Sequence, residues 1–113
     1  MIERENNIMV IQDIAPQFTY QGPRFKELGP NSGEEFRDDY LIPWLIENHD
    51  DKQAVIDFAG TRMFSPSFLE EAFGGAVRKG YGEKIRQIKF LNVPRTWGND
   101  LRKYISEALR YVR

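Results

Sequence analysis

The sequence contains no cysteine and a single histidine, His49. Disulfides, thiolate metal sites, a cysteine nucleophile and a cysteine–histidine pair are therefore excluded, and one histidine cannot build a zinc cluster. We expect no cofactor and no metal. We expect His49 to end a helix instead, since a histidine suits the negative end of the helix dipole.

Long apolar runs are also missing, because no stretch approaches the length of a membrane span. The first seven residues are too polar and acidic for a signal peptide. The chain has 113 residues, of which 41% are hydrophobic and 29% charged, which suits one domain over residues 1–113. We predict a single cytoplasmic domain that makes no contact with a membrane.

The net charge of −1 hides an uneven distribution. Residues 1–75 carry six basic and fourteen acidic side chains, a net −8, whereas residues 76–113 carry ten basic and three acidic ones, a net +7. Such a split can mark a nucleic-acid partner for the basic part. In one folded domain the two signs can also interleave on the surface, and we favour this interpretation because charged runs are usually solvated.

Apolar runs predict strands at residues 7–12, 53–58 and 84–93. The middle run is contiguous rather than alternating, which predicts a central parallel strand buried on both faces. Residues 13–31 contain several proline and glycine residues, and they fit one or two short edge strands or an ordered loop.

Helices are predicted between these strands and after the last one. Ser32 and Glu35 form a capping box at the start of the first helix, in which Pro43 predicts a kink or a restart. The last helix is predicted from the apolar spacing of residues 101–112, and it starts at Thr96 or at residues 99–100.

The second helix starts at Ser65, with Pro66 in the first turn, or one turn later at Ser67. Gly80 is predicted to end it as a left-handed C-cap. Gly74 and Gly75 in its middle cost about 1 kcal/mol each relative to alanine, and a close approach to the sheet or to a partner would explain them. The element order β-β-α-β-α-β-α predicts an α/β fold with a mixed sheet and helices packed mainly on one face.

Polar residues gather where the middle strand ends. Asp57 and Gly60 close this strand, and Ser65 and Ser67 open the next helix, which places them at the carboxyl edge of the sheet. The simplest interpretation is that both serines only cap the helix. Alternatively Ser67 accepts a phosphate, which would find free amides at the helix start and would repel a docked partner.

Other functions have less support in the sequence. The glycine-rich phosphate-binding motifs are absent, and the paired carboxylates are sequence neighbours that point apart on helices, so we predict that the chain is not an enzyme. Basic residues of the C-terminal part alternate with Tyr81 and Trp97, which could follow a nucleic-acid backbone, but the pI is low for such a domain. A small-ligand or nucleotide pocket near Asp57 and Gly60 is a further alternative.

The stretch from Asp57 to Leu69 resembles the signature of STAS domains, the fold of anti-sigma-factor antagonists. In that family a strand ends in Asp-x-x-Gly, and an Asp-Ser-Ser-Gly-Leu turn then opens a helix whose second serine is phosphorylated by a partner kinase. Ser67 matches this phosphoacceptor. Ser65, Pro66 and Phe68 replace the Asp, the first Ser and the Gly of the family pattern.

The chain resembles still more closely a bacterial STAS-like family of unknown function. It shares the motifs Gly-Pro-Arg at residues 22–24, Ser-Gly-Glu-Glu-Phe-Arg at 32–37 and Ser-x-Ser-Phe-x-x-Glu-x-Phe-Gly at 65–74. The resemblance implies a STAS-like fold and a regulatory role through contact with a protein partner, often a kinase-like or ATPase-like protein. We expect the partner-binding edge to comprise these residues: Arg24, Asp57, Arg62, Ser65, Ser67 and Phe68.

Overall fold

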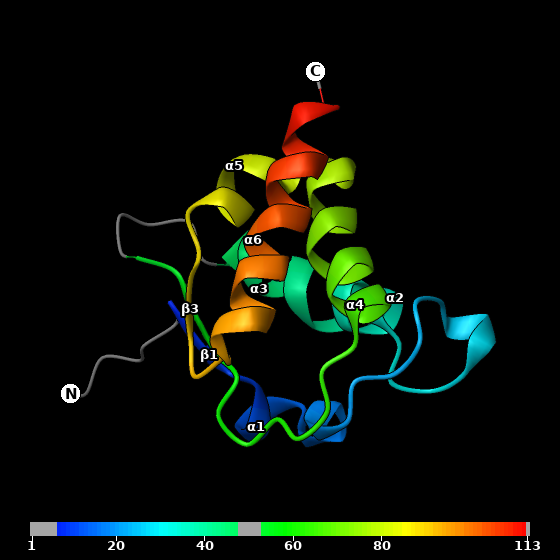
Figure 1. Ribbon diagram of the computed structural model, residues 1–113. Helices are drawn as coiled ribbons and strands as arrows, with labels where there is room; N and C mark the ends of the chain where they lie inside the picture. Colours follow the sequence, from blue (N-terminus) through cyan, green and yellow to red (C-terminus); the bar gives the residue numbers. More distant parts are fainter. Residues whose placement is uncertain (1–6, 48–52, 113) are drawn as a thin grey trace.

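Three short parallel strands form the sheet of the computed structural model, which describes residues 7–47 and 53–112 (Figure 1). In sheet order the strands are β1 (Ile8–Val10), β2 (Val55–Asp57) and β3 (Lys89–Leu91). The α/β class and the central, parallel position of β2 are confirmed. The predicted mixed sheet is wrong: both strand pairings are parallel, because a helical crossover returns the chain to the same end of the sheet before each new strand.

The second β segment predicted over residues 13–31 is also wrong. That part of the chain holds helix α1 (Ile11–Ile14) and two 3₁₀ turns, η1 (Pro16–Thr19) and η2 (Lys26–Leu28), with a single bridge between Tyr20 and Met63. Prolines remove backbone donors that a strand ladder needs, and Pro16 instead begins η1. The alternative of an ordered loop describes the segment better.

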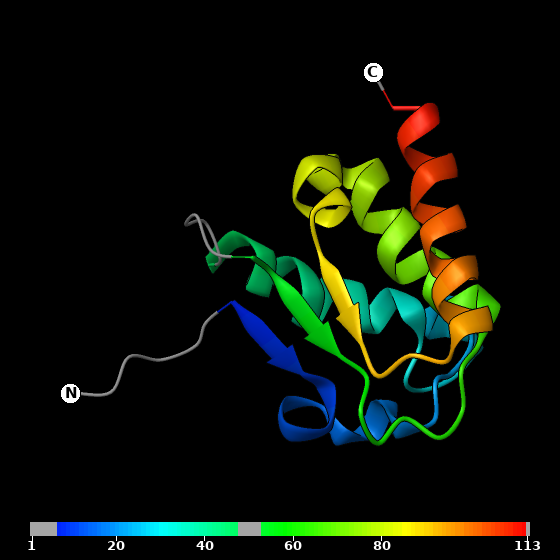
Figure 2. The same ribbon diagram turned by 60° about the vertical axis from the view of Figure 1, so that its left-hand side comes forward.

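Helices cover one face of the sheet (Figure 2). Met9, Ile56 and Phe90 share a register position and belong to the core or pack against it. On the opposite face Ile8 is 39% exposed and Leu91 37% exposed. The helices therefore pack mainly on one face of the sheet, as predicted. The prediction that β2 is buried on both faces is wrong.

The first crossover helix spans residues 33–47 and consists of α2 (Gly33–Phe36), the π-helical η3 (Arg37–Leu41) and α3 (Ile42–Glu47). Ser32 caps it as predicted, since its Oγ accepts a hydrogen bond from the Glu35 amide at 3.0 Å. The Glu35 carboxylate accepts from the Asn31 amide rather than from that of Ser32. The helix continues through a π-helical segment just before Pro43, which accommodates the missing donor. His49 lies outside the described residues.

The second crossover helix spans residues 66–79 and contains α4 (Pro66–Leu69), the π-helical η4 (Glu70–Gly74) and the start of η5 (Val77–Tyr81). Gly80 ends it with a φ of 103°, which confirms the predicted left-handed cap. Helix α5 (Gly82–Arg86) follows, so the predicted strand over residues 84–93 is wrong in its first half. The buried residues Ile85 and Ile88 lie three apart, which is the spacing of one helix face, whereas residues three apart in a strand point to opposite faces.

Helix α6 (Arg95–Arg110) packs against η4 and presents Leu101, Ile105 and Ala108 to the core. It begins directly after Pro94, a little earlier than predicted. The centre of the core is aromatic, and its fully buried rings are Phe18, Phe36, Phe58, Phe68 and Phe73. Among the described helices none is long and apolar enough to cross a bilayer.

Candidate functional site

Ser65 is the residue that caps the second crossover helix. Its Oγ accepts a hydrogen bond from the Phe68 amide at 3.3 Å, and its own amide donates to Oε1 of the buried Gln21 at 2.9 Å. The choice left open between Ser65 and Ser67 is thereby decided for Ser65. The start of α4 is fixed in place by this pair of bonds.

Ser67 has no such structural role. It is the second residue of α4 and is exposed, and within the described part of the chain its side chain makes no hydrogen bond. Its hydroxyl is therefore free to react with, or bind to, another molecule.

Phe68 does not belong to a partner-binding edge. Its side chain is 1% exposed, and its ring lies 5.7 Å from the rings of Phe18 and Phe36. Ser65 starts the helix two residues earlier than Ser67 would, and Phe68 lies four residues before the buried Ala72, on the inward face of the helix. Its place in the predicted edge is wrong for this reason.

Asp57 ends β2, and its carboxylate is held by neighbouring groups. Oδ1 accepts hydrogen bonds from the Ala59 amide at 2.9 Å and from Asn92 Nδ2 at 2.7 Å. Gly60 follows with a φ of 89°, and a Cβ there would lie 2.5 Å from Gln12 Oε1. Asp57 Oδ1 and the space beside Gly60 are thus taken up by groups of the protein itself.

Arg62 lies on the exposed loop between β2 and α4. Its amide donates to the Thr19 carbonyl at 2.8 Å, while its side chain takes part in no ion pair with the residues that the structure describes. Arg62 and Ser67 are consequently the two predicted edge residues that the structure leaves exposed.

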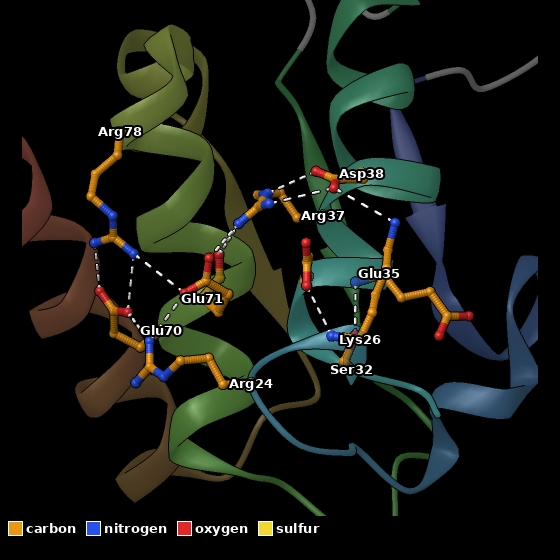
Figure 3. A network of polar contacts seen from close by, with 10 residues as sticks. Arg24, Lys26, Ser32, Glu35, Arg37, Asp38, Glu70, Glu71 and Arg78 are labelled. Atoms are coloured by element: carbon orange, nitrogen blue, oxygen red, sulfur yellow. Dashed lines mark hydrogen bonds and ion pairs between the residues drawn. The ribbon is translucent and has the colours of Figure 1, made fainter. Parts of the chain in front are cut away.

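Arg24 is drawn into an ion-pair network with the second crossover helix (Figure 3). Its Nη1 donates to Glu70 Oε1 at 2.6 Å and to Glu71 Oε1 at 3.2 Å. Arg78 binds the same Glu70 from the other side, at 2.8 Å. Arg24 therefore ties the loop that precedes the first crossover helix to the second one, and a third of its side chain remains exposed.

The buried part of this network joins the two crossover helices. Arg37, whose side chain is 7% exposed, binds Glu71 Oε2 at 2.5 Å and Asp38 Oδ1 at 2.8 Å. Sequence reasoning missed this contact, because the partners are 34 positions apart. A signal was present in the spacing, because Arg37 lies four residues before the buried Leu41 and so shares its face of the helix.

Gly74 and Gly75 make room for the network. A Cβ on Gly74 would lie 2.5 Å from Glu70 Oε2, and one on Gly75 would lie 2.7 Å from an Arg37 guanidinium nitrogen. The predicted close approach is thus made by charged side chains rather than by the sheet.

The family model described as "STAS-like domain of unknown function (DUF4325)" matches residues 32–94, which is more than half of the chain. The chain belongs to this STAS-like family. No curated protein and no solved structure matches it.

Several basic residues of the STAS-like domain have partners inside the molecule. Arg102 Nη2 donates to the Ile88 carbonyl at 2.6 Å, and its guanidinium lies 4.8 Å from the centre of the Phe90 ring. Burial lowers the pKa of Arg102. Arg86 pairs with Glu83, and among the described residues no group of three or more potential ligands could hold a metal ion. Of the predicted edge residues, Ser67 therefore stands out only as an exposed hydroxyl at the start of α4.

The ion pairs predict an acid-sensitive stability for the STAS-like domain. The hydrogen bond from Arg78 lowers the pKa of Glu70 below its ordinary 4.5. Burial raises the pKa of Asp38, but the hydrogen bond and charge of Arg37 outweigh it and lower the pKa below 3.8. A carboxylate with a lowered pKa stabilises the fold above its unfolded-state pKa, and this contribution is lost as the pH falls through the folded-state pKa.

We expect Glu70→Gln to have a smaller loss of unfolding free energy between about pH 6 and about pH 3 than the wild type. Urea denaturation at a series of pH values measures this difference. Glu107→Gln is the matched control, because Glu107 is exposed on α6 and forms no ion pair with the described residues. Equal acid sensitivity in Glu70→Gln and the wild type would show that the ion pairs of Glu70 do not stabilise the fold.

Proposed function

We propose that this STAS-like domain is a non-catalytic regulatory module that binds a protein partner, and that phosphorylation of Ser67 switches this binding. The observation that carries the proposal is the contrast between Ser67 and the rest of its motif. In the motif at residues 65–74, Ser65 caps the helix, Phe68 and Phe73 fill the core, and Glu71 pairs with Arg37. Ser67 alone among these side chains is exposed and makes no hydrogen bond with the described residues.

The charges around Ser67 support a role as phosphoacceptor. Glu70 and Glu71 follow Ser67 by three and four residues and lie on the same side of the helix. Their carboxylates are already paired with arginines, which limits the repulsion that a phosphate would meet. The guanidinium of Arg24 is partly exposed and lies beside Glu70 on the same side of the helix, and arginine binds phosphate well.

A phosphate would change the surface that a partner meets. The dianion would add charge of about −1.5 to −2 at an exposed position, which weakens contact with an apolar or acidic surface. By resemblance the partner is a kinase-like or ATPase-like regulator, and we place the domain in the cytoplasm, where such regulators act.

The test is an affinity capture from the native host with wild type, Ser67→Ala and Ser67→Glu, with mass spectrometry to map phosphate on Ser65 and Ser67. We expect one partner to be captured by wild type and Ser67→Ala and lost with Ser67→Glu, and we expect phosphate on Ser67. Ser106→Glu is the matched control, because Ser106 is an exposed serine on α6. A partner that binds Ser67→Glu as well as the wild type, with no phosphate on Ser67, would refute the switch.

A further inference from the structure

The segment from Gly22 to Asn31, here the 22–31 loop, leaves the body of the domain and returns to the same place (Figure 1). The Gly22 amide donates to the Asn31 carbonyl at 2.9 Å, which closes the base of the loop. A Cβ on Gly22 would lie 2.6 Å from the Asn31 carbonyl oxygen, so the two ends approach more closely than other residues allow. The segment is thus an Ω-loop, a type of loop that is often functional.

Hydrogen bonds hold this loop in one conformation. The carbonyls of Pro23 and Arg24 accept from the amides of Gly33 and Glu34, at 2.9 and 3.0 Å. The Lys26 amide donates to Glu34 Oε1 at 2.9 Å. Because the Arg24 side chain also binds Glu70 and Glu71, the loop is anchored to both crossover helices.

The tip of this anchored loop is apolar. Phe25 is 40% exposed and Leu28 is 64% exposed. The Leu28 amide donates to the Phe25 carbonyl at 3.0 Å, which closes a 3₁₀ turn. This bond brings the backbones of Phe25 and Leu28 together at the tip of the loop, and the two exposed side chains are called the apolar projection below.

Acidic residues surround the projection. Glu27 is at the tip, and Glu34 Oε1 accepts a hydrogen bond from the Lys26 amide at 2.9 Å. Lys26 Nζ, the cation at the tip, lies 3.8 Å from Asp38 Oδ2. The rim around the two apolar side chains is therefore acidic, which suits a basic partner surface and disfavours an anionic membrane.

We propose that Phe25 and Leu28 insert into an apolar pocket with a basic rim on the protein partner. This inference rests on the proposed function, and it assigns the docking element of that function to the 22–31 loop. A loop that is held rigid before binding loses little conformational entropy when it docks. A side chain that becomes fully desolvated in a well-packed pocket of a partner can carry a large part of the binding energy.

The test is a titration of the purified captured partner with wild type, Phe25→Ser and Leu28→Ser, by isothermal calorimetry. We expect each variant to raise the Kd by about tenfold or more, since a truncated central apolar contact has an effect of this size. Ile46→Ser is the matched control, because Ile46 is 56% exposed at the end of α3, and its Kd should stay within about twofold of the wild type. Urea denaturation of each variant verifies that the domain remains folded.

Photo-cross-linking from a benzophenone side chain at position 28 then identifies the contact on the partner. Cross-links to apolar residues flanked by lysine or arginine would support the proposal, and cross-links to a polar or acidic surface would overturn it. Unchanged affinity of Phe25→Ser and Leu28→Ser together with loss of binding by Ser67→Glu would refute the loop and leave the switch intact. A wild type that captures no partner would refute both proposals.

Flotation with vesicles of phosphatidylcholine and phosphatidylglycerol tests whether the projection inserts into a membrane instead of a protein pocket. We expect no binding. Binding to phosphatidylglycerol vesicles that is lost in Leu28→Ser would show that the projection inserts into a membrane, and it would overturn the assignment to a protein pocket.

Discussion

Replacing Phe68 with alanine is expected to lower the free energy of unfolding by about 3–5 kcal/mol. The Phe68 ring is fully buried, and it packs against Phe18 of η1 and Phe36 of α2. Truncation removes this apolar burial and leaves a cavity that the two adjoining helices can fill only in part. Urea denaturation, followed by circular dichroism, measures the loss.

Met63→Ala is the control for the Phe68 experiment. Met63 lies on the loop just before α4 and is 54% exposed, so its truncation should change the free energy of unfolding by less than about 0.5 kcal/mol. Phe68→Leu keeps most of the apolar volume, and we expect a loss between the two. A loss below about 1 kcal/mol for Phe68→Ala would show that the ring lies at the surface after all.

The helix starts and ends could be predicted from the sequence, because they depend on hydrogen bonds between nearby residues. Ser32 and Ser65 start the helices, and Gly80 ends one, because each satisfies backbone groups within a few residues of itself. The central position of β2 followed from its contiguous apolar run. None of these inferences needs knowledge of a distant part of the chain.

Features that depend on distant contacts were not predictable. Residues 13–31 were predicted to fit short edge strands or an ordered loop, yet η1 buries Phe18, and Tyr20 directly after it is 55% exposed. For Phe68, the family resemblance favoured a surface position, although its spacing from Ala72 also suits a buried helix face. Arg24 was predicted to lie on the partner-binding edge, and its ion pairs could not be predicted because the carboxylates that bind it are 46 and 47 positions away.

The motifs at residues 32–37 and 65–74, which carried the family resemblance, form the two sides of the interface between the crossover helices. Gly33 lets the first crossover helix approach the second, since a Cβ there would lie 2.5 Å from the Phe68 carbonyl oxygen. Phe36 then contacts Phe68, and Arg37 contacts Glu71 one turn further on. Most of the motif residues thus specify how the helices pack, which leaves the exposed Ser67 as the member that packing does not explain.

Replacing Arg37 with alanine is expected to lower the free energy of unfolding by about 3 kcal/mol, near the lower end of the range for breaking a buried ion pair. The side chains of Arg37 and Glu71 are 7% and 12% exposed. Removal of the arginine leaves the Glu71 carboxylate with Arg24 at 3.2 Å and Arg78 at 3.8 Å, which compensate part of its charge. Urea denaturation near neutral pH measures the loss.

A matched pair of variants separates burial from charge. Arg86→Ala breaks an exposed ion pair with Glu83, so we expect its stability to equal that of the wild type within error. The double variant Arg37→Met with Glu71→Leu removes both buried charges and keeps apolar volume, so it should recover most of the stability lost in Arg37→Ala. If Arg37→Ala were as stable as Arg86→Ala, the ion pair would not hold the two crossover helices together. If the double variant were as unstable as Arg37→Ala, the loss would come from the shape of the interface rather than from an unpaired buried charge.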